Sequence, residues 1–147
     1  MSEPSKDFGG IEADMWAKLE NHARQVRPNA YVPYSKFPVG AAVLTTTGDI
    51  FRGCNVENAT FGATVCAERT AIGCAVADGH TELRALCVIT EVSPPAAPCG
   101  ICRQVIAEFC DDLPIMMVHP EGERRYTTLG KLLPLRFSGW DFIDEQP

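Results

Sequence analysis

Two short cysteine-containing motifs constrain this chain more than any other feature of its sequence. The first is Cys66-Ala67-Glu68-Arg69, and the second, more than thirty residues later, is Pro98-Cys99-Gly100-Ile101-Cys102. A cysteine pair at two-residue spacing, with a third cysteine far along the chain, is a zinc-binding pattern. Three protein ligands leave one coordination position for water, as in catalytic zinc sites, and Glu68 would move protons for that water. The fold must therefore bring the two motifs together.

The spacing within each motif suits a metal site at the start of two helices. Cys99 and Cys102 are three residues apart, so in the first turn of a helix their sulfur atoms lie on one face. Cys66 and Glu68 are two apart and would not face each other along a helix. They can still converge on a metal beyond the N-terminus, because helical side chains lean toward that end. The dipoles of two helix N-termini also favour thiolates.

Hydrophobic periodicity divides the chain into alternating helices and strands. Apolar positions recur with helical spacing from Ile11 to about Arg27, and Thr64 is expected to cap a helix from Cys66 to Ala77. The remaining elements are expected to be strands at 39–44, 50–56, 83–90, 115–118 and 124–127, and helices at 99–109 and 129–133. This order predicts an α/β fold, a three-layer α/β/α sandwich with a mixed five-stranded sheet.

The length of 147 residues is that of a single domain. We expect residues 1–10 to form a flexible N-terminal tail and residues 11–147 to form one catalytic domain. Inside the first two strands, Gly40 and Gly53 predict bulges or close approach of another backbone segment.

Composition argues against several kinds of partner. The formal net charge of −6 disfavours nucleic acid, because phosphate contacts need clustered Lys and Arg. No apolar run approaches the length of a membrane span, and the polar N-terminus has no signal-peptide core. In a chain without a secretion signal, seven cysteines are expected to be reduced thiols, some of them on metal. We therefore expect a cytoplasmic protein that binds neither nucleic acid nor membrane.

Some motifs allow a structural interpretation. Cys99-Gly100-Ile101-Cys102 alone could be a redox or structural pair, and Asn55-Val56-Glu57-Asn58-Ala59 could serve only as turn chemistry, since such side chains cap backbone groups. The position of this second motif just before Cys66 favours a functional role. Four other cysteines lie in apolar segments and are expected to be small buried hydrophobes, namely Cys54, Cys74, Cys87 and Cys110. One of them could act as a fourth metal ligand, which would make the zinc site structural.

Three blocks in the same order give the chain a resemblance to a known family. They are YSKFPVGAAVLTTTGDIFRGCNVENATFGATVCAERTAI, PCGICRQVIAEF and LLPLRFSGWDF. They resemble the homotetrameric cytidine deaminases, over nearly the whole stretch from the first helix to Phe142. The resemblance implies hydrolysis of cytidine and deoxycytidine to uridine and deoxyuridine with release of ammonia, as in pyrimidine salvage. It implies one zinc ion per subunit on Cys66, Cys99 and Cys102, with Glu68 as the proton shuttle.

The same resemblance implies roles for further residues. Asn55 and Glu57 match a ribose-binding pair, and Arg69 and Gln104 match residues that hydrogen-bond the metal thiolates. The other residues expected to bind substrate are Phe37, Ala59, Phe61, Ala67 and Phe137, the last reaching the base in a neighbouring subunit. Phe61 departs from many relatives, which carry Tyr there, and so lacks a hydroxyl for contacts across subunits.

Three rival functions are compatible with parts of this pattern. A blasticidin-type aminonucleoside deaminase would share the zinc blocks, but the intact Glu57 weighs against it. A polynucleotide-editing deaminase would need a basic stripe with aromatic residues for single strands, which this acidic chain lacks. A non-catalytic zinc-stabilised scaffold would have no use for Glu68 or for an open ligand position.

Overall fold

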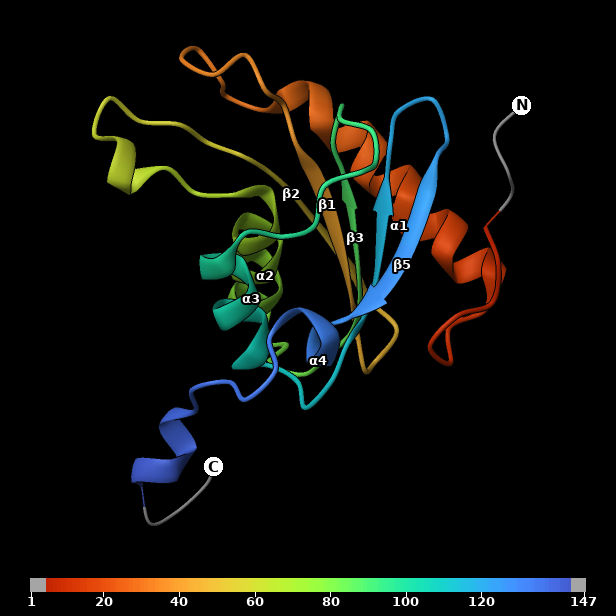
Figure 1. The fold of residues 1–147 in the computed structure, drawn as a ribbon, viewed down its shortest axis with the longest axis vertical. Coiled ribbons are helices and arrows are strands. Elements are labelled where there is room, and N and C mark those ends of the chain that lie inside the picture. The colour runs from red at the N-terminus through yellow and green to blue at the C-terminus, as the bar shows by residue number, and fades with distance from the viewer. Residues whose placement is uncertain (1–4, 144–147) are drawn as a thin grey trace.

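The fold is a five-stranded sheet covered by helices on both faces (Figure 1), as a computed structural model describing residues 5–143 shows. The strands are β1 (Gly40–Thr45), β2 (Ile50–Cys54), β3 (Leu83–Ile89), β4 (Pro114–Val118) and β5 (Arg124–Thr128). The α-helices are α1 (Ala13–Val26), α2 (Ala67–Ala77), α3 (Gly100–Ala107) and α4 (Leu129–Leu132). Short 3-10 turns lie at Arg27–Asn29, Phe61–Ala63 and Gly139–Phe142.

The sheet is mixed, with the strand order β2-β1-β3-β4-β5. Only the β3–β4 pair is parallel, and α3 lies in the connection between these two strands. The other neighbours pair antiparallel, including the β1–β2 hairpin. Helix α1 lies on one face of the sheet and α2 and α3 on the other, so the predicted three-layer α/β/α sandwich is confirmed.

Strand β1 shows how one apolar run serves two cores. Ala41 and Val43 belong to the core beneath α2, whereas Ala42 and Leu44 belong to the core beneath α1, where Trp16 is fully buried. Side chains of a strand alternate between faces, so a central strand needs apolar residues at every position. The uninterrupted apolar run in the sequence follows from this position in the middle of the sheet.

Gly40 and Gly53 lie where another backbone segment passes too close for a side chain. A Cβ at Gly40 would overlap the carbonyl oxygen of Ala23 in α1, and a Cβ at Gly53 would overlap the backbone of α2 at Ala71. The predicted close approach is therefore confirmed at both positions. Gly53 allows α2, the helix preceded by Cys66, to pack directly against the sheet.

The helix starts differ from the predictions by one residue. Cys66 and Cys99 have extended backbone conformations and are the N-cap residues of α2 and α3. The predicted N-cap at Thr64 is wrong, because Val65 pairs with Val56 in an isolated β-bridge that keeps the chain extended up to Cys66. Similarly, α3 begins at Gly100 and ends at Ala107, so its predicted range of 99–109 was too long.

The two chain ends behave differently over their described residues. Of the expected N-terminal tail, residues 1–4 lie outside the described part, while Phe8 pairs with Ile11 and accepts a hydrogen bond from Trp16 Nε1 at 3.2 Å. The C-terminal segment after α4 runs away from the body of the domain (Figure 1). No helix between residues 5 and 143 is long and apolar enough to cross a membrane.

Candidate active site

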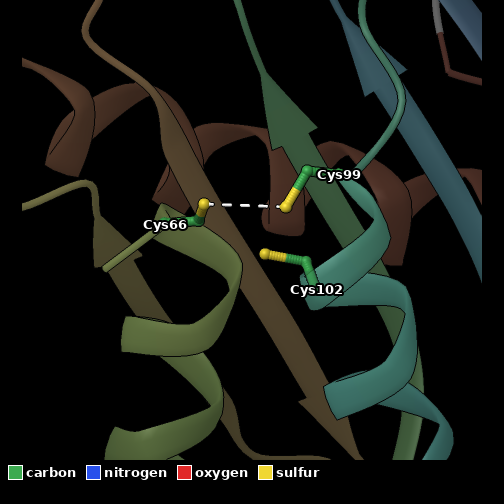
Figure 2. A group of neighbouring side chains, drawn as sticks. All are labelled: Cys66, Cys99 and Cys102. Atoms are coloured by element: carbon green, nitrogen blue, oxygen red, sulfur yellow. Dashed lines mark hydrogen bonds between the residues drawn. The ribbon is translucent and has the colours of Figure 1, made fainter. Parts of the chain in front are cut away.

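The three motif cysteines converge at the N-termini of α2 and α3. Cys66 caps α2, Cys99 caps α3, and Cys102 lies in the first turn of α3. Their three sulfur atoms all lie within 4.8 Å of one another, and the Cys66 and Cys99 sulfurs are 3.8 Å apart. Figure 2 shows the three side chains pointing toward a common centre between the helices. We call these three residues the cysteine cluster.

The cysteine cluster has dimensions that suit zinc. Zn–S bonds of about 2.3 Å at tetrahedral angles place two sulfur atoms about 3.8 Å apart. The measured separation of 3.8 Å between Cys66 and Cys99 agrees with this. Within the described residues no fourth His, Cys, Asp or Glu joins the group, which leaves one tetrahedral position for a water or a substrate atom.

The surroundings of the cysteine cluster favour a thiolate at Cys66. A hydrogen bond from the Cys102 thiol, aided by the Arg69 guanidinium and Cys99, lowers the pKa of Cys66 to about 5. The same thiol–thiolate bond raises the pKa of Cys102, because Cys102 is the partner that keeps the proton. Helix N-termini add to the preference for negative charge. A soft cation such as zinc would replace the shared proton in this arrangement.

Glu68 lies in the first turn of α2 with only 5% of its surface exposed. Burial is the largest cause that raises the pKa of its carboxyl group, and the charge of Cys66 acts in the same direction. A raised pKa brings a carboxyl group closer to the range in which a side chain can both accept and donate a proton during catalysis. The role of Glu68 as proton shuttle stays a prediction, and the burial of its carboxyl group agrees with it.

Arg69 faces the cysteine cluster. Its Nη2 donates to the Cys66 sulfur at 3.5 Å and to the carbonyl oxygen of Thr64 at 3.2 Å. Its Nε is buried and has no hydrogen-bond partner among the described residues. The bond to Cys66 is the main cause that raises the pKa of Arg69. Arg69 therefore contacts a thiol of the cysteine cluster, and its contacts are not those of a surface ion pair.

The segment Asn55–Glu57 lies between the cysteine cluster and a second loop. Val56 pairs with Val65, next to Cys66, and on its other side with Tyr31. The Asn55 side chain accepts from the Val39 N–H at 2.9 Å and donates to the Phe37 carbonyl at 2.9 Å. Both polar ends of Asn55 therefore hold the loop at 31–39, as the turn-chemistry interpretation expected.

Glu57 is held at one oxygen atom. Its Oε1 accepts the backbone N–H groups of Tyr34 at 3.0 Å and Ser35 at 3.1 Å. The Ser35 hydroxyl is the largest cause that lowers the pKa of Glu57, and these two N–H groups and Lys36 add to it. The result is an ionised carboxylate with one fixed oxygen.

A cavity of about 320 Å³ adjoins Glu57 and is lined by Tyr34, Ser35, Glu57, Phe61 and Thr64. Its size falls within the range of small-molecule sites, roughly 300–1,000 Å³. A larger cavity of about 660 Å³ lies between the end of α3 and the C-terminal segment, and none of the predicted site residues lines it. We therefore assign the smaller cavity to the site.

The remaining predicted site residues differ in their exposure to solvent. Ala67 is fully buried at the start of α2, whereas Phe37, Ala59, Phe61 and Phe137 are exposed. Gln104 donates from Nε2 to the Phe137 carbonyl oxygen at 3.0 Å, which ties α3 to the C-terminal segment. Its predicted bond to a thiolate stays a prediction.

Sequence reasoning missed the residues of the loop at 31–39 that hold Glu57. Tyr34 and Ser35 line the cavity, and Tyr34 packs edge-on against Phe61 with ring centroids 5.5 Å apart. A usable signal was the serine two residues before Phe37, because a serine hydroxyl often accepts the N–H two positions on. That bond is present at 3.0 Å.

Three converging thiols that could hold a zinc ion, next to a buried carboxyl group with a raised pKa, are the pattern of the zinc-dependent deaminases. Residues 16–117 match the family model described as "Cytidine and deoxycytidylate deaminase zinc-binding region". The chain belongs to this family, whose zinc-binding region contains Cys66, Cys99 and Cys102.

Three relatives are similar in sequence to most of this chain. A cytidine deaminase from Sporosarcina psychrophila is 50% identical over 125 residues, covering 84% of this chain and 92% of that protein. The crystal structure of cytidine deaminase from Burkholderia pseudomallei superposes with a TM-score of 0.79 at 44% identity, covering 82% of this chain and 98% of that one. A blasticidin-S deaminase from Bacillus cereus is 32% identical over 112 residues, covering 71% of this chain and 79% of that protein.

Proposed function

We propose that this chain catalyses zinc-dependent hydrolysis of cytidine and deoxycytidine to uridine and deoxyuridine, with release of ammonia. The observation that carries the proposal is the cysteine cluster with the buried carboxyl of Glu68 beside it. The named relatives at 44–50% identity support the same substrate class. The intact Glu57 supports cytidine and deoxycytidine over a blasticidin-type substrate.

Each group has a separate part in this reaction. Zinc, when bound by the cysteine cluster, lowers the pKa of a water molecule at the open position. Glu68 would accept one proton from the attacking water and pass it to N3 of the base, and would then take the second proton, from the hydroxyl group now on C4, and pass it to the leaving amine. The sum of these steps consumes one water and releases ammonia. Arg69 stabilises the thiolate of Cys66 throughout.

The side of the site that faces the sugar is formed by Glu57. Since Oε1 is held by two backbone N–H groups, the other carboxylate oxygen is available to accept bonds from ribose hydroxyls. Phe37, Ala59, Phe61 and Ala67 would border the base and the sugar. Phe137 would act from a neighbouring subunit, because in its own chain it lies on the segment that leaves the domain.

We further propose a homotetramer with one zinc ion per subunit. Helix α2 exposes Val76 and Cys74. Large apolar side chains are also exposed in the 3-10 turn Phe61–Ala63 and on the C-terminal segment after α4, namely Phe61, Leu135, Phe137, Phe142 and Ile143. Exposed apolar surface of this kind is typical of protein–protein contacts. Sedimentation that gave a fully active monomer of 16.0 kDa would contradict the assembly.

We also propose that the protein acts in the cytoplasm and that its role is pyrimidine salvage. A single nucleoside is the expected substrate, and the net charge of −6 supports the absence of a nucleic-acid partner.

The function is tested by following the absorbance change as cytidine converts to uridine, with and without a zinc chelator. Glu68→Gln should retain one zinc per chain, because all ligands remain, yet lose turnover by about 10²–10⁴-fold or more, since the proton carrier is gone. Blasticidin S is assayed in parallel. Preferential turnover of blasticidin S, or near-normal cytidine turnover by Glu68→Gln, would contradict the proposal.

A further inference from the structure

The loop at 31–39 is held at both ends by the segment that carries Asn55 and Glu57. At its start, Tyr31 N–H donates to the Asn55 carbonyl at 3.0 Å, and Glu57 N–H donates to the Tyr31 carbonyl at 2.9 Å. At its end, Val39 N–H donates to the Asn55 side chain at 2.9 Å. Between these ends the residues at 33–37 are exposed, and hydrogen bonds to Glu57, Asn55 and neighbouring loop residues set the course of the loop.

Phe37 is fixed on both sides of its backbone by polar side chains. Its N–H donates to Ser35 Oγ at 3.0 Å, and its carbonyl oxygen accepts from Asn55 Nδ2 at 2.9 Å. Lys36, between Ser35 and Phe37, has a φ of +58°, a left-handed conformation that a non-glycine residue adopts only when its neighbours impose it. The bonds to Phe37 lie on one side of Lys36, and the N–H of Lys36 itself donates to the Val32 carbonyl at 3.1 Å.

Ser35 joins this arrangement to Glu57 in two ways. Its backbone N–H donates to Glu57 Oε1 at 3.1 Å. Its hydroxyl oxygen accepts from Phe37, which leaves the hydroxyl proton for the Glu57 carboxylate, whose pKa it lowers. A continuous chain of hydrogen bonds therefore runs from Asn55 through the Phe37 backbone and Ser35 to Glu57.

We propose that Ser35 is a positioning residue for sugar recognition, whose hydroxyl aligns the Glu57 carboxylate and the Phe37 backbone on the wall of the 320 Å³ cavity. This inference rests on the proposed function. Among the described residues the hydrogen bonds of Ser35 go to Glu57 and Phe37 and not to the cysteine cluster, so its contribution should be confined to binding the sugar and should leave the chemical step unchanged.

The test compares Ser35→Ala with the wild-type holoenzyme on two substrates. With cytidine, KM should rise about tenfold, as expected for the loss of one hydrogen bond to a charged group, while kcat stays nearly constant. With 2′,3′-dideoxycytidine, which lacks the hydroxyls that Glu57 would bind, KM should hardly change. Ser35→Thr, which keeps a hydroxyl, should restore most of the affinity for cytidine.

A matched control is available at a remote serine. Ser93 donates from Oγ to Glu123 at 2.7 Å on the surface, so Ser93→Ala removes the same kind of bond away from the cavity and should leave both KM values unchanged. An unchanged cytidine KM in Ser35→Ala, or an equal loss on both substrates, would overturn the inference alone. No cytidine turnover by the wild-type enzyme would overturn the proposed function, and this inference with it.

Discussion

The cysteine cluster and the other four cysteines carry the same side chain in opposite environments. In the cluster, hydrogen bonds lower the pKa of Cys66 to about 5. On β3, complete burial raises the pKa of Cys87, and at the end of α3 burial raises the pKa of Cys110 to about 11. Cys87 and Cys102 are both fully buried, so burial alone does not separate the two groups.

The cluster differs from the other cysteines in the polar groups that surround its sulfur atoms. The cluster lies at two helix N-termini and beside a guanidinium, whereas Cys87 lies in the apolar core beneath α1. A thiol in the first setting becomes a metal ligand, and a thiol in the second acts as a small hydrophobe. The prediction of buried cysteines is wrong for Cys74, whose side chain is exposed on α2.

The largest expected difference between the two groups is in zinc content. Cys102→Ala and Cys87→Ala each remove one sulfur from a fully buried position. Cys102→Ala should lose the zinc ion and, with it, more than about a thousandfold in turnover, because an incomplete ligand set binds zinc weakly. Cys87→Ala should retain the zinc ion and wild-type turnover, and should lose only some thermal stability because of the cavity that it creates. Metal analysis of the purified variants measures this, and a zinc-loaded Cys102→Ala would contradict the assignment.

The sequence predicted the cysteine cluster because three thiols at these spacings have few other uses. It predicted the sheet because the strands are marked by continuous apolar runs and turn residues. It did not predict that Cys66 and Cys99 are N-caps, since the bridge between Val56 and Val65 that sets the start of α2 is a tertiary contact. The support of Glu57 by Tyr34 and Ser35 also depends on pairing between segments more than twenty residues apart.

A smaller effect is expected from removing the Arg69 guanidinium, which contacts the Cys66 sulfur. Arg69→Gln removes the guanidinium that donates to Cys66 at 3.5 Å, so turnover should fall roughly ten- to a hundredfold, or zinc retention should weaken. Loss of a cation raises the pKa of neighbouring acids, and the lower apparent pKa of the pH–rate profile should therefore rise. Arg52→Gln serves as the control, because Arg52 is exposed and bonds only Gln25 at 3.2 Å among the described residues. Wild-type turnover, zinc content and pH profile in Arg69→Gln would show that the guanidinium does not affect the cluster.

The smallest expected effect concerns Cys110, a thiol outside the cluster. Burial raises its pKa from 9.0 to about 11 in the folded protein, and its Sγ donates to the Ile106 carbonyl at 3.3 Å. Between these two pKa values the unfolded chain releases the proton before the folded chain does. The stability that Cys110 contributes is therefore complete below about pH 9 and is lost as the pH rises toward 11.

Cys110→Ala should lower the melting temperature at neutral pH, because it removes a packed side chain, but should make the decline between pH 9 and 11 shallower than in the wild type. Thermal melts of the variant and the wild type at a series of pH values measure the slope. Parallel curves for Cys110→Ala and the wild type would mean that Cys110 ionises alike in the folded and unfolded chain. Burial would then not be what keeps this thiol apart from those of the cluster.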